Sequence, residues 1–325
     1  MRLFEINSSS EIPLIGTICF GIIDRGTNLL QIRPSTLCSL SCIFCSTDLG
    51  PNSKTRVTDY IVELDYLLEW VKEVAKFKGS KLQAHIDFGE PTLYPKLIEL
   101  VQGLKEIKEI EIVSMESKNL HLDFKKIDEL AEVGLERINL SIDALEPELA
   151  RKLTGTESYD ITRIIELAEY IAKSRIKLLL APVWVPGLND EEIPKIINFA
   201  KEIGAKLGIQ KYEAHKYGRK PEGVNPISWW KFYRKLEEWE KEFNVKLRIT
   251  PKDFGIEKRK MLPIVFEKGQ KVRVKIKAPG WIRNEMIGVA KNRCISIVDC
   301  QAEIGDEVKV EILENKHNLY VAKRV

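Results

Sequence analysis

Three cysteines lie within one eight-residue segment, CSLSCIFC, at Cys38, Cys42 and Cys45. The chain has only six cysteines among 325 residues, so chance rarely produces this C-x3-C-x2-C spacing. Iron–sulfur clusters normally take a cysteine thiolate on every iron, and three thiolates on a four-iron cubane leave one iron open for another ligand. The alternatives are buried free thiols and a structural zinc loop. Zinc needs a fourth ligand, however, and no His or Cys follows within the next thirty residues.

The cysteine segment resembles the cluster-binding loop of the radical S-adenosylmethionine (radical SAM) superfamily, including the aromatic Phe44 just before the last cysteine. The resemblance implies a [4Fe–4S] cluster on the three cysteines, with the amino acid part of S-adenosylmethionine (SAM) on the open iron. It also implies an external one-electron reductant, which allows cleavage of SAM to methionine and a 5′-deoxyadenosyl radical. That radical removes a hydrogen atom from the substrate.

The segment DFGEPTLYP ends the next predicted strand after the cysteine loop. Glycine lets a backbone approach a ligand closely, so Gly89 suits a binding turn, and the Glu90 carboxylate can accept hydrogen bonds from an ammonium group. The turn resembles the superfamily's Gly-Gly-Glu motif, which receives the SAM amino group, although Phe88 stands where the first glycine often lies. The alternative is an ordinary strand-to-helix turn.

The segment RINLSIDAL places Ser141 and Asp143 two residues apart, so both project from one face of a strand. This resembles the strand of the superfamily that contacts the ribose of SAM. The alternative is that Asp143 only caps the following helix. Ser117 ends the preceding predicted strand, where relatives carry a Thr-Asn-Gly turn, whereas this chain has Lys118 and Asn119 after the serine. The resemblance therefore extends the expected SAM contacts to these three side chains: Ser117, Ser141 and Asp143.

Two later segments follow predicted strands. The first, VPGLND, is similar to a turn in radical SAM relatives of the molybdopterin-biosynthesis type, and Asn189 within it is expected to cap a helix, an architectural role. The second, EAHKYGRK, gathers His215, Lys216 and Arg219 at the expected mouth of the fold. Cations in that place suit a phosphate, a carboxylate or an RNA backbone, so these three residues are substrate-binding candidates. The alternative is a solvated basic loop.

Strand-like and helix-like segments alternate along residues 29–218, which favours βα units and a parallel sheet. We therefore predict a partial (β/α)6 TIM-like barrel, an α/β fold in which chemistry gathers at the C-terminal ends of the strands. The expected strands are 81–88, 110–115, 136–142, 177–185 and 206–212. The expected helices are 57–77, 97–105, 124–133, 161–172 and 191–203.

Two further segments flank this domain. Residues 1–28 are expected to form an N-terminal β extension. Residues 219–262 are expected to form a helical and strand extension that ends in a linker. An aromatic stripe in this segment has the spacing of one helix face and is expected to be core rather than a ligand site. The stripe consists of Trp229, Phe232, Tyr233, Leu236 and Phe243.

Residues 263–325 change to short alternating strands separated by Gly, Asp and Asn turns, which predicts a small, OB-like all-β barrel. The segment resembles a TRAM domain, an RNA-binding barrel found in RNA-modifying enzymes. Four cations alternate along its first strand and share a face that suits phosphates: Lys271, Arg273, Lys275 and Lys277. The alternative is a solubilising face on an autonomous barrel. Cys294 and Cys300 are expected to be packed thiols or a disulfide, with an auxiliary cluster as a further alternative.

Composition bounds the function. The net charge is +3 and the hydrophobic fraction is 44%, values typical of a soluble protein rather than a general nucleic-acid binder. No run of about eighteen apolar residues predicts a membrane span, and the N-terminus lacks the apolar core of a signal peptide. Scattered remaining cysteines indicate a reducing cytoplasm, and the low glutamine content suggests a thermophile.

These features together predict a radical SAM enzyme that modifies RNA, with tRNA as the leading candidate. The layout resembles that of archaeal radical SAM proteins with TRAM tails, for which the resemblance implies no particular reaction. The chain lacks the additional three-cysteine domain of tRNA methylthiotransferases, so methylthiolation is not implied. One alternative is a radical SAM enzyme that acts on a small molecule or peptide. Another is a non-enzymatic iron–sulfur protein that binds RNA.

Overall fold

The computed structural model describes residues 2–118 and 121–325, so Asn119 lies outside the described residues. The chain groups into two compact units. Unit 1 contains Met1–Leu37, Thr55–Val113 and Ile256–Val325, and unit 2 contains Cys38–Lys54 and Ser114–Gly255. This grouping by contact cuts across the four segments expected from sequence, because the first and last parts of the chain pack together in unit 1.

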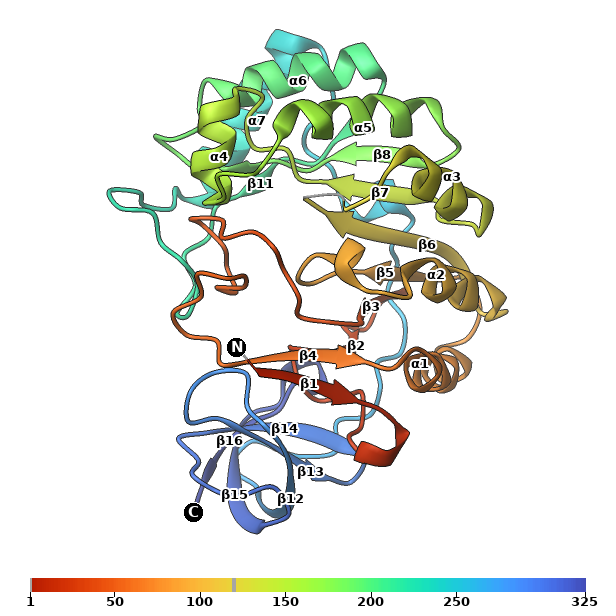
Figure 1. The fold of residues 1–325 in the computed structure, drawn as a ribbon, viewed down its shortest axis with the longest axis vertical. Helices are drawn as coiled ribbons and strands as arrows, with labels where there is room; N and C mark the ends of the chain where they lie inside the picture. The colour runs from red at the N-terminus through yellow and green to blue at the C-terminus, as the bar shows by residue number, and fades with distance from the viewer. Residues whose placement is uncertain (1, 119–120) are drawn as a thin grey trace. The chain divides into compact units, whose positions relative to one another are not determined.

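Outside the barrel described below, unit 1 contains paired strands and α-helices that can be followed in Figure 1. β1 (Arg2–Ile6) pairs in parallel with β4 (Thr58–Val62). β2 (Gly21–Asp24) pairs antiparallel with β3 (Leu29–Arg33), and β3 pairs in parallel with β5 (Leu82–Ile86). The helices are α1 (Leu64–Lys78) and α2 (Leu97–Glu106).

The helix expected over residues 57–77 is wrong in its first part, which forms strand β4. Thr58, Tyr60 and Val62 are buried while the residues between them are half-buried. This period of two is the pattern of a strand. The pairing partner is β1, more than fifty residues earlier in the chain, so a local helical pattern could not reveal it. The helix itself begins only at Leu64.

Unit 2 contains parallel strands that alternate with helices, as predicted. β6 (Ile110–Ser117) runs from unit 1 into unit 2 and pairs with β7 (Arg137–Leu140). β7 pairs with β8 (Lys177–Leu180), and β8 pairs with β10 (Lys206–Leu207). A separate parallel pair consists of β9 (Val183–Trp184) and β11 (Gln210–Lys211). The helices are α3 (Phe124–Glu132), α4 (Pro147–Thr154), α5 (Ile161–Lys173), α6 (Glu192–Ile203) and α7 (Trp229–Phe243).

The strand expected over residues 177–185 is interrupted, because β8 ends at Leu180 and β9 begins at Val183. Pro182 lies in the gap and has no backbone N–H to donate to a neighbouring strand. Its carbonyl still accepts a hydrogen bond of 2.7 Å from the N–H of Gln210. The short helix α4 was not predicted at all.

Helix α7 corrects the expectation that the aromatic stripe is core. Phe232 and Leu236 are buried, with 3% and 2% of their surface exposed. Trp229 and Tyr233 lie on the same helix but keep 54% and 48% of their surface exposed. Phe243 is half-buried. Only part of the stripe is therefore core.

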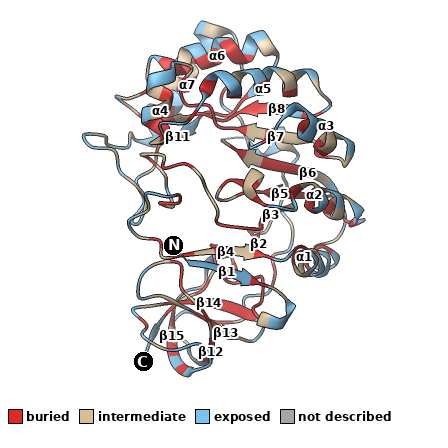
Figure 2. Ribbon diagram, in the orientation of Figure 1, coloured by how far each residue is buried: buried red, intermediate tan, exposed pale blue. Residues whose placement is uncertain are grey.

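The predicted small all-β barrel is confirmed within unit 1. Five described strands close in the order β12-β13-β14-β16-β15, and their inward-facing residues are buried, as the red segments show (Figure 2). The strands are β12 (Lys271–Pro279), β13 (Met286–Ala290), β14 (Arg293–Val298), β15 (Glu307–Glu314) and β16 (Val321–Arg324).

The barrel is joined closely to the rest of unit 1. The N–H of Cys294 donates to the carbonyl of Ile15, and the N–H of Tyr320 donates to that of Gly16, each at 2.8 Å. The Tyr60 hydroxyl of β4 donates to the carbonyl of Pro279 at 2.6 Å. The barrel and the N-terminal residues therefore form one packed body rather than an autonomous tail.

The three remaining cysteines are buried free thiols: Cys19, Cys294 and Cys300. The expectation that Cys294 and Cys300 are packed thiols is therefore confirmed, and the alternative of a disulfide is wrong. Among the described residues, no helix has both the length and the apolar character to cross a bilayer.

Candidate functional site

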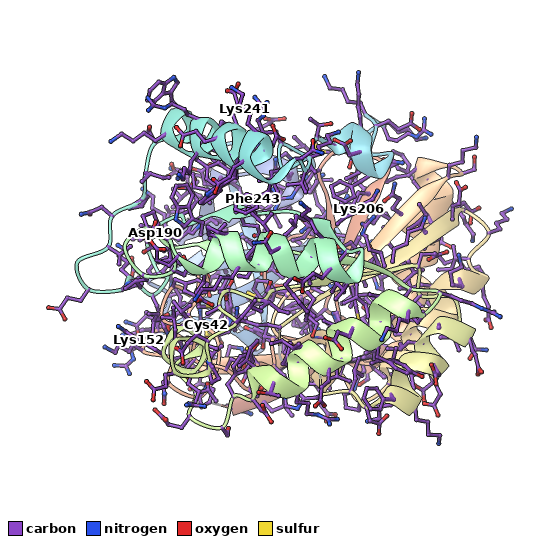
Figure 3. The ribbon with its side chains drawn as sticks, turned by 90° about the horizontal axis from the view of Figure 1, so that it is seen from above. Cys42, Lys152, Asp190, Lys206, Lys241 and Phe243 are labelled. Carbon is purple, nitrogen blue, oxygen red and sulfur yellow. The ribbon has the colours of Figure 1, made fainter. Side chains whose placement is uncertain are left out.

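The cysteine loop follows β3 and is anchored in unit 2 by the end of helix α4. The N–H of Ser41 donates to the carbonyl of Thr154, and the N–H of Ile43 donates to that of Leu153, both at 3.0 Å. The last carbonyls of a helix lack partners within the helix, so the loop satisfies them. Gly155 ends the helix at φ +57°, and a Cβ there would lie 2.3 Å from the carbonyl oxygen of Ser41. Figure 3 shows Cys42 close to this helix, on which Lys152 is labelled.

Arg219 anchors the same loop from a segment far along the chain. Its guanidinium donates to the carbonyls of Cys42 at 3.2 Å and Leu49 at 2.6 Å, and it pairs with the buried Asp48 carboxylate at 2.8 Å. Its backbone N–H also donates to the carbonyl of Cys45 at 2.8 Å. Through these contacts Arg219 holds the cysteine loop, and its expected substrate role stays a prediction.

The three thiols are half-buried at one end of this anchored loop: Cys38, Cys42 and Cys45. Burial raises the pKa of the Cys42 thiol, while the cations of Lys118 and Arg219 act in the opposite direction. Among the described residues, no three His, Cys, Asp or Glu side chains are grouped closely enough to hold a single metal ion. A four-iron cubane takes each thiolate on a different iron, so it does not require the three thiols to converge on one ion.

Lys118 lies among the expected site residues, and sequence reasoning missed it. Its side chain is 15% exposed, its ammonium pairs with the Asp143 carboxylate, and it lies 5.4 Å from the centre of the Phe44 ring. Burial lowers the pKa of Lys118, and the negative charges of Cys42 and Glu116 counteract this. The signal available in the sequence was a lysine directly after Ser117, where relatives have an asparagine.

The expected ribose-contacting residues lie at the carboxyl ends of neighbouring strands in unit 2. Ser117 ends β6, and the N–H of Ser141, just after β7, donates to its carbonyl at 2.9 Å. Asp143 follows, and its carboxylate accepts a 2.8 Å hydrogen bond from the N–H of Val183. The helix-cap alternative for Asp143 is wrong, because the side chain of Glu146 caps α4.

The N-cap expected at Asn189 is also wrong, since α6 begins at Glu192 without a side-chain cap. The buried Asn189 amide instead donates to the carbonyls of Asp143 and Val183, each at 2.9 Å. Its oxygen accepts from the N–H of Val185 at 2.8 Å. Asn189 therefore fixes the loop that carries Asp143, which agrees with the expected architectural role.

The turn at Gly89 and Glu90 belongs to unit 1. The N–H of Glu90 donates to the carbonyl of Leu37, the residue directly before Cys38, at 2.7 Å. Gly89 has φ +64°, and a Cβ there would lie 2.4 Å from the same carbonyl oxygen. The buried Glu90 carboxylate accepts from the hydroxyl and N–H of Thr92, at 2.6 and 3.2 Å. This turn is a close backbone contact that only glycine allows.

Phe88 departs from the family pattern yet keeps a glycine-like backbone, with φ +79°. Few L-residues adopt this region. The ring lies under the Arg33 guanidinium at 4.2 Å and beside the Trp281 indole, with 5.2 Å between ring centres. Arg33 is itself fixed by the buried Asp87 carboxylate at 3.1 Å. These contacts hold Phe88 in its strained conformation.

The remaining candidates lie on exposed surfaces. His215 and Lys216 are exposed in the loop before α7 in unit 2, so they stay substrate candidates. On the barrel, the predicted alternation is confirmed for Lys271, Arg273 and Lys275, which are exposed, while Val272 between the first two is half-buried and Val274 between the last two is buried. The fourth cation, Lys277, is half-buried and pairs with Glu11.

Comparison with known proteins identifies the family. The family model of the radical SAM superfamily matches residues 32–200. Uncharacterized protein MJ0103 of Methanocaldococcus jannaschii is 44% identical over 345 aligned positions, which cover 98% of this chain and 80% of that protein. GTP 3′,8-cyclase of Listeria monocytogenes is 29% identical over 193 residues, covering 58% of this chain and 55% of the cyclase. The chain thus spans about half the length of that cyclase.

The fold is shared with solved structures. Streptococcus suis SuiB superposes with a TM-score of 0.55 over 68% of this chain and 48% of its own, at 20% identity. This likeness shows a TIM-like α/β fold in the shared region. The family model covers more than half of the chain and includes the cysteine loop. The chain therefore belongs to the radical SAM superfamily, whose members use a [4Fe–4S] cluster and SAM.

Proposed function

We propose that this radical SAM enzyme modifies RNA, with tRNA as the first candidate, and that its barrel is a TRAM-like RNA-binding domain. The chemistry comes from the cluster, which, when bound, supplies the electron for reductive cleavage of SAM. The contribution of this chain is to hold the cluster loop, bind SAM and present the RNA.

The observation that carries the RNA proposal is the charge on one barrel face. Residues directly opposite each other on antiparallel strands share a face, and Arg273 lies opposite Lys309. Both are exposed, and like charges in this position destabilise the folded barrel. Lys271 and Lys275 flank Arg273, although Glu311 and Glu307 lie opposite them. A bound phosphate backbone would offset the repulsion.

The SAM contacts are proposed from the motifs of the family. In unit 2, Asp143 is held by Val183 and Asn189, so its carboxylate is fixed for the ribose hydroxyls. Its pairing with Lys118 means that the ammonium must move when a ribose binds. Phe44, Ser117 and Ser141 are proposed to contact SAM as well. In unit 1, Gly89 and Glu90 are proposed to receive its amino group.

The direct test is mass spectrometry of tRNA nucleosides from cells with and without this protein. We expect one modified nucleoside to disappear and to return with the wild-type chain but not with Cys42→Ala. Reconstituted wild-type protein should also cleave SAM to 5′-deoxyadenosine, and Cys42→Ala should not. Unchanged nucleosides in tRNA and rRNA, from a protein that still cleaves SAM, would contradict the RNA proposal.

A second candidate is a radical SAM enzyme that acts on a small nucleotide. The similarity to GTP 3′,8-cyclases over 58% of this chain favours it. Incubation of the reconstituted enzyme with SAM, reductant and GTP separates the two, because a cyclase-like enzyme would consume GTP without RNA. Loss of GTP at a rate matched to formation of 5′-deoxyadenosine would support this second candidate.

A further inference from the structure

The first half of helix α7 presents large aromatic rings to solvent. Trp229, Trp230 and Tyr233 are 54%, 66% and 48% exposed, whereas Phe232 and Trp239 on the other side of the helix are buried. Figure 3 shows α7 at the surface in this view, with Lys241 and Phe243 marking its C-terminal half. Large clustered apolar groups on a protein surface commonly mark an interaction site.

The exposed rings are ordered by their neighbours. Trp229 stacks on Tyr233, with 5.7 Å between ring centres and 27° between planes. The buried Lys211 ammonium lies 4.9 Å from the Trp229 ring and is fixed by Glu213 at 2.7 Å. The Arg234 guanidinium lies 5.1 Å from the ring of Trp230. Each indole therefore has a cation beside it.

The charges of this region are separated along the chain. Residues 214–236 contain six Lys and Arg and one Glu, whereas residues 237–243 contain four Glu and one Lys. A helix favours acidic residues at its N-terminus and basic residues at its C-terminus. No acidic residue lies in the first turn of α7, so the charge order largely opposes helix stability. Within the helix, Arg234 and Lys235 pair with Glu238 at 3.3 Å. The cations nevertheless gather beside the exposed rings, where they would attract a negatively charged partner.

We propose that the N-terminal half of α7 is a stacking platform for a single-stranded stretch of polynucleotide. This proposal rests on the proposed RNA substrate and names a second surface that binds it. Unpaired bases would stack on Trp230 and on the Trp229–Tyr233 pair, with phosphates beside Lys231 and Arg234. Aromatic rings bind single strands in this way, with little sequence preference and with cations along the backbone. A helix lying in a membrane surface inserts a continuous apolar face of Trp, Phe and Leu, whereas the residues Phe232, Leu236 and Trp239 of α7 are buried in the protein.

The test uses the full-length protein and a fluorescein-labelled 12-nucleotide oligouridine, followed by fluorescence anisotropy. Each stacked base contributes enough that Trp230→Ala should weaken binding about tenfold. Trp230→Phe should weaken it less, and Arg234→Glu should also lower the salt dependence of binding. Phe124→Ala is the matched control, because Phe124 is a 45% exposed ring that packs on Tyr170 elsewhere in unit 2. It should bind like the wild type.

Because the rings are exposed, thermal melting of the ring variants should match that of the wild type, which separates lost binding from lost folding. The proposal is overturned if Trp229→Ala and Trp230→Ala bind oligouridine within twofold of the wild type. Equal affinity for a 12-base-pair duplex would also overturn it. A protein that binds anionic phospholipid vesicles but does not bind oligouridine would overturn it as well. So would a wild-type dimer that the Trp230→Ala substitution converts to a monomer.

Failure of this inference differs from failure of the proposed function. If tRNA binding is lost in barrel-charge variants but kept in the ring variants, RNA remains the substrate and only the platform is wrong. If the wild type binds neither tRNA nor oligouridine, both proposals fail together.

Discussion

Single residues at this site combine local strain with functional position, and Phe88 is the clearest example. Its φ of +79° belongs to a region that costs an L-residue about 1–2 kcal/mol. Backbone strain of this kind persists only where surrounding contacts fix it, and it gathers at functional turns. Arg33 and Trp281 supply those contacts here. The turn thus keeps the backbone of a glycine while adding an aromatic contact to the barrel.

At position 88, the glycine variant should be more stable than the alanine variant, which is the reverse of the usual order of stability. Phe88→Ala loses the ring contacts and keeps the strain, whereas Phe88→Gly loses the contacts and relieves the strain. We expect the glycine variant to be more stable than the alanine variant by about 1 kcal/mol, measured by urea unfolding. At the buried helical position Phe199, the matched control, alanine should be the more stable of the two by a similar amount. If the alanine variant is the more stable one at position 88 as well as at position 199, the backbone at Phe88 is not strained.

Lys118 places a positive charge beside the cluster ligands, since it interacts electrostatically with the thiolates of Cys42, Cys38 and Cys45. Reduction adds negative charge to a cluster, and a nearby cation favours the reduced form. Lys118→Met removes this charge while keeping the side-chain length. We expect the reduction potential of the reconstituted cluster to fall on the order of 50 mV, equivalent to about 1 kcal/mol for one electron.

Potentiometric titration followed by electron paramagnetic resonance measures this change. Lys173→Met, at the far end of helix α5, is the matched control and should leave the potential unchanged. A rise in potential in Lys118→Met would show that the lysine does not act through its charge.

At the scale of elements, two segments far apart in the chain clamp the cysteine loop. The end of α4 accepts hydrogen bonds from Ser41 and Ile43 on one side. On the other side, Arg219 binds the carbonyls of Cys42 and Leu49. Both clamps bind the loop backbone rather than its thiols, so the cysteine side chains stay available for iron. The loop is therefore ordered by its neighbours rather than by its own sequence.

Removal of Arg219 should weaken the retention of the cluster. Asp48 is only 3% exposed, and a buried carboxylate left without its partner costs about 3 kcal/mol. We expect Arg219→Ala to retain less than half of the wild-type iron and sulfide after anaerobic reconstitution, as measured by chemical analysis. The neighbouring exposed Lys220→Ala should retain all of it. Full iron content in Arg219→Ala would mean that α4 alone orders the loop.

Elements that depend on local sequence could be predicted, whereas those that depend on distant partners could not. The βα alternation could be predicted, because periodicity is a local property, and the spacing of the cysteines is likewise local, although their role as ligands stays a prediction. Strand β4 was missed, because its partner β1 lies far away in the chain. The contacts of Lys118, Arg219 and Asn189 could not be predicted for the same reason. Their partners lie 25, 177 and 46 residues away, as shown by the bonds to Asp143, Cys42 and the Asp143 carbonyl.

On the scale of the whole molecule, the barrel is built into the body of unit 1. Lys78 and Asp24 form a fully buried pair at 2.6 Å, and this pair also binds the start of the C-terminal segment. The Lys78 ammonium donates to the carbonyl of Lys260 at 2.8 Å, and Asp24 accepts from the N–H of Leu262 at 2.7 Å. This pair fixes the segment that leads into the barrel. Loss of the barrel itself would remove the partners of the Tyr60 hydroxyl and of the Ile15 and Gly16 carbonyls.

Deletion of residues 263–325 should consequently unfold unit 1 rather than remove one function. Each buried group that loses its partner costs about 1–3 kcal/mol, and several are affected at once. We expect the truncated chain to be insoluble or to melt far below the wild type in circular dichroism. A truncated chain that melts like the wild type would show that the barrel is autonomous after all.

RNA binding by the barrel is therefore better tested by reversing charge on the intact chain. Arg273→Glu together with Lys309→Glu replaces two exposed cations that face each other, so folding should be unaffected. Each lost phosphate contact should lower the slope of log affinity against log salt by about 1, so the double variant should lose about 2 in slope with transcribed tRNA. Lys125→Glu on α3, exposed and outside the barrel, is the matched control and should keep the wild-type slope. If the double variant binds tRNA with unchanged affinity and slope, the barrel face does not contact the phosphates, and the like-charged pair needs another explanation.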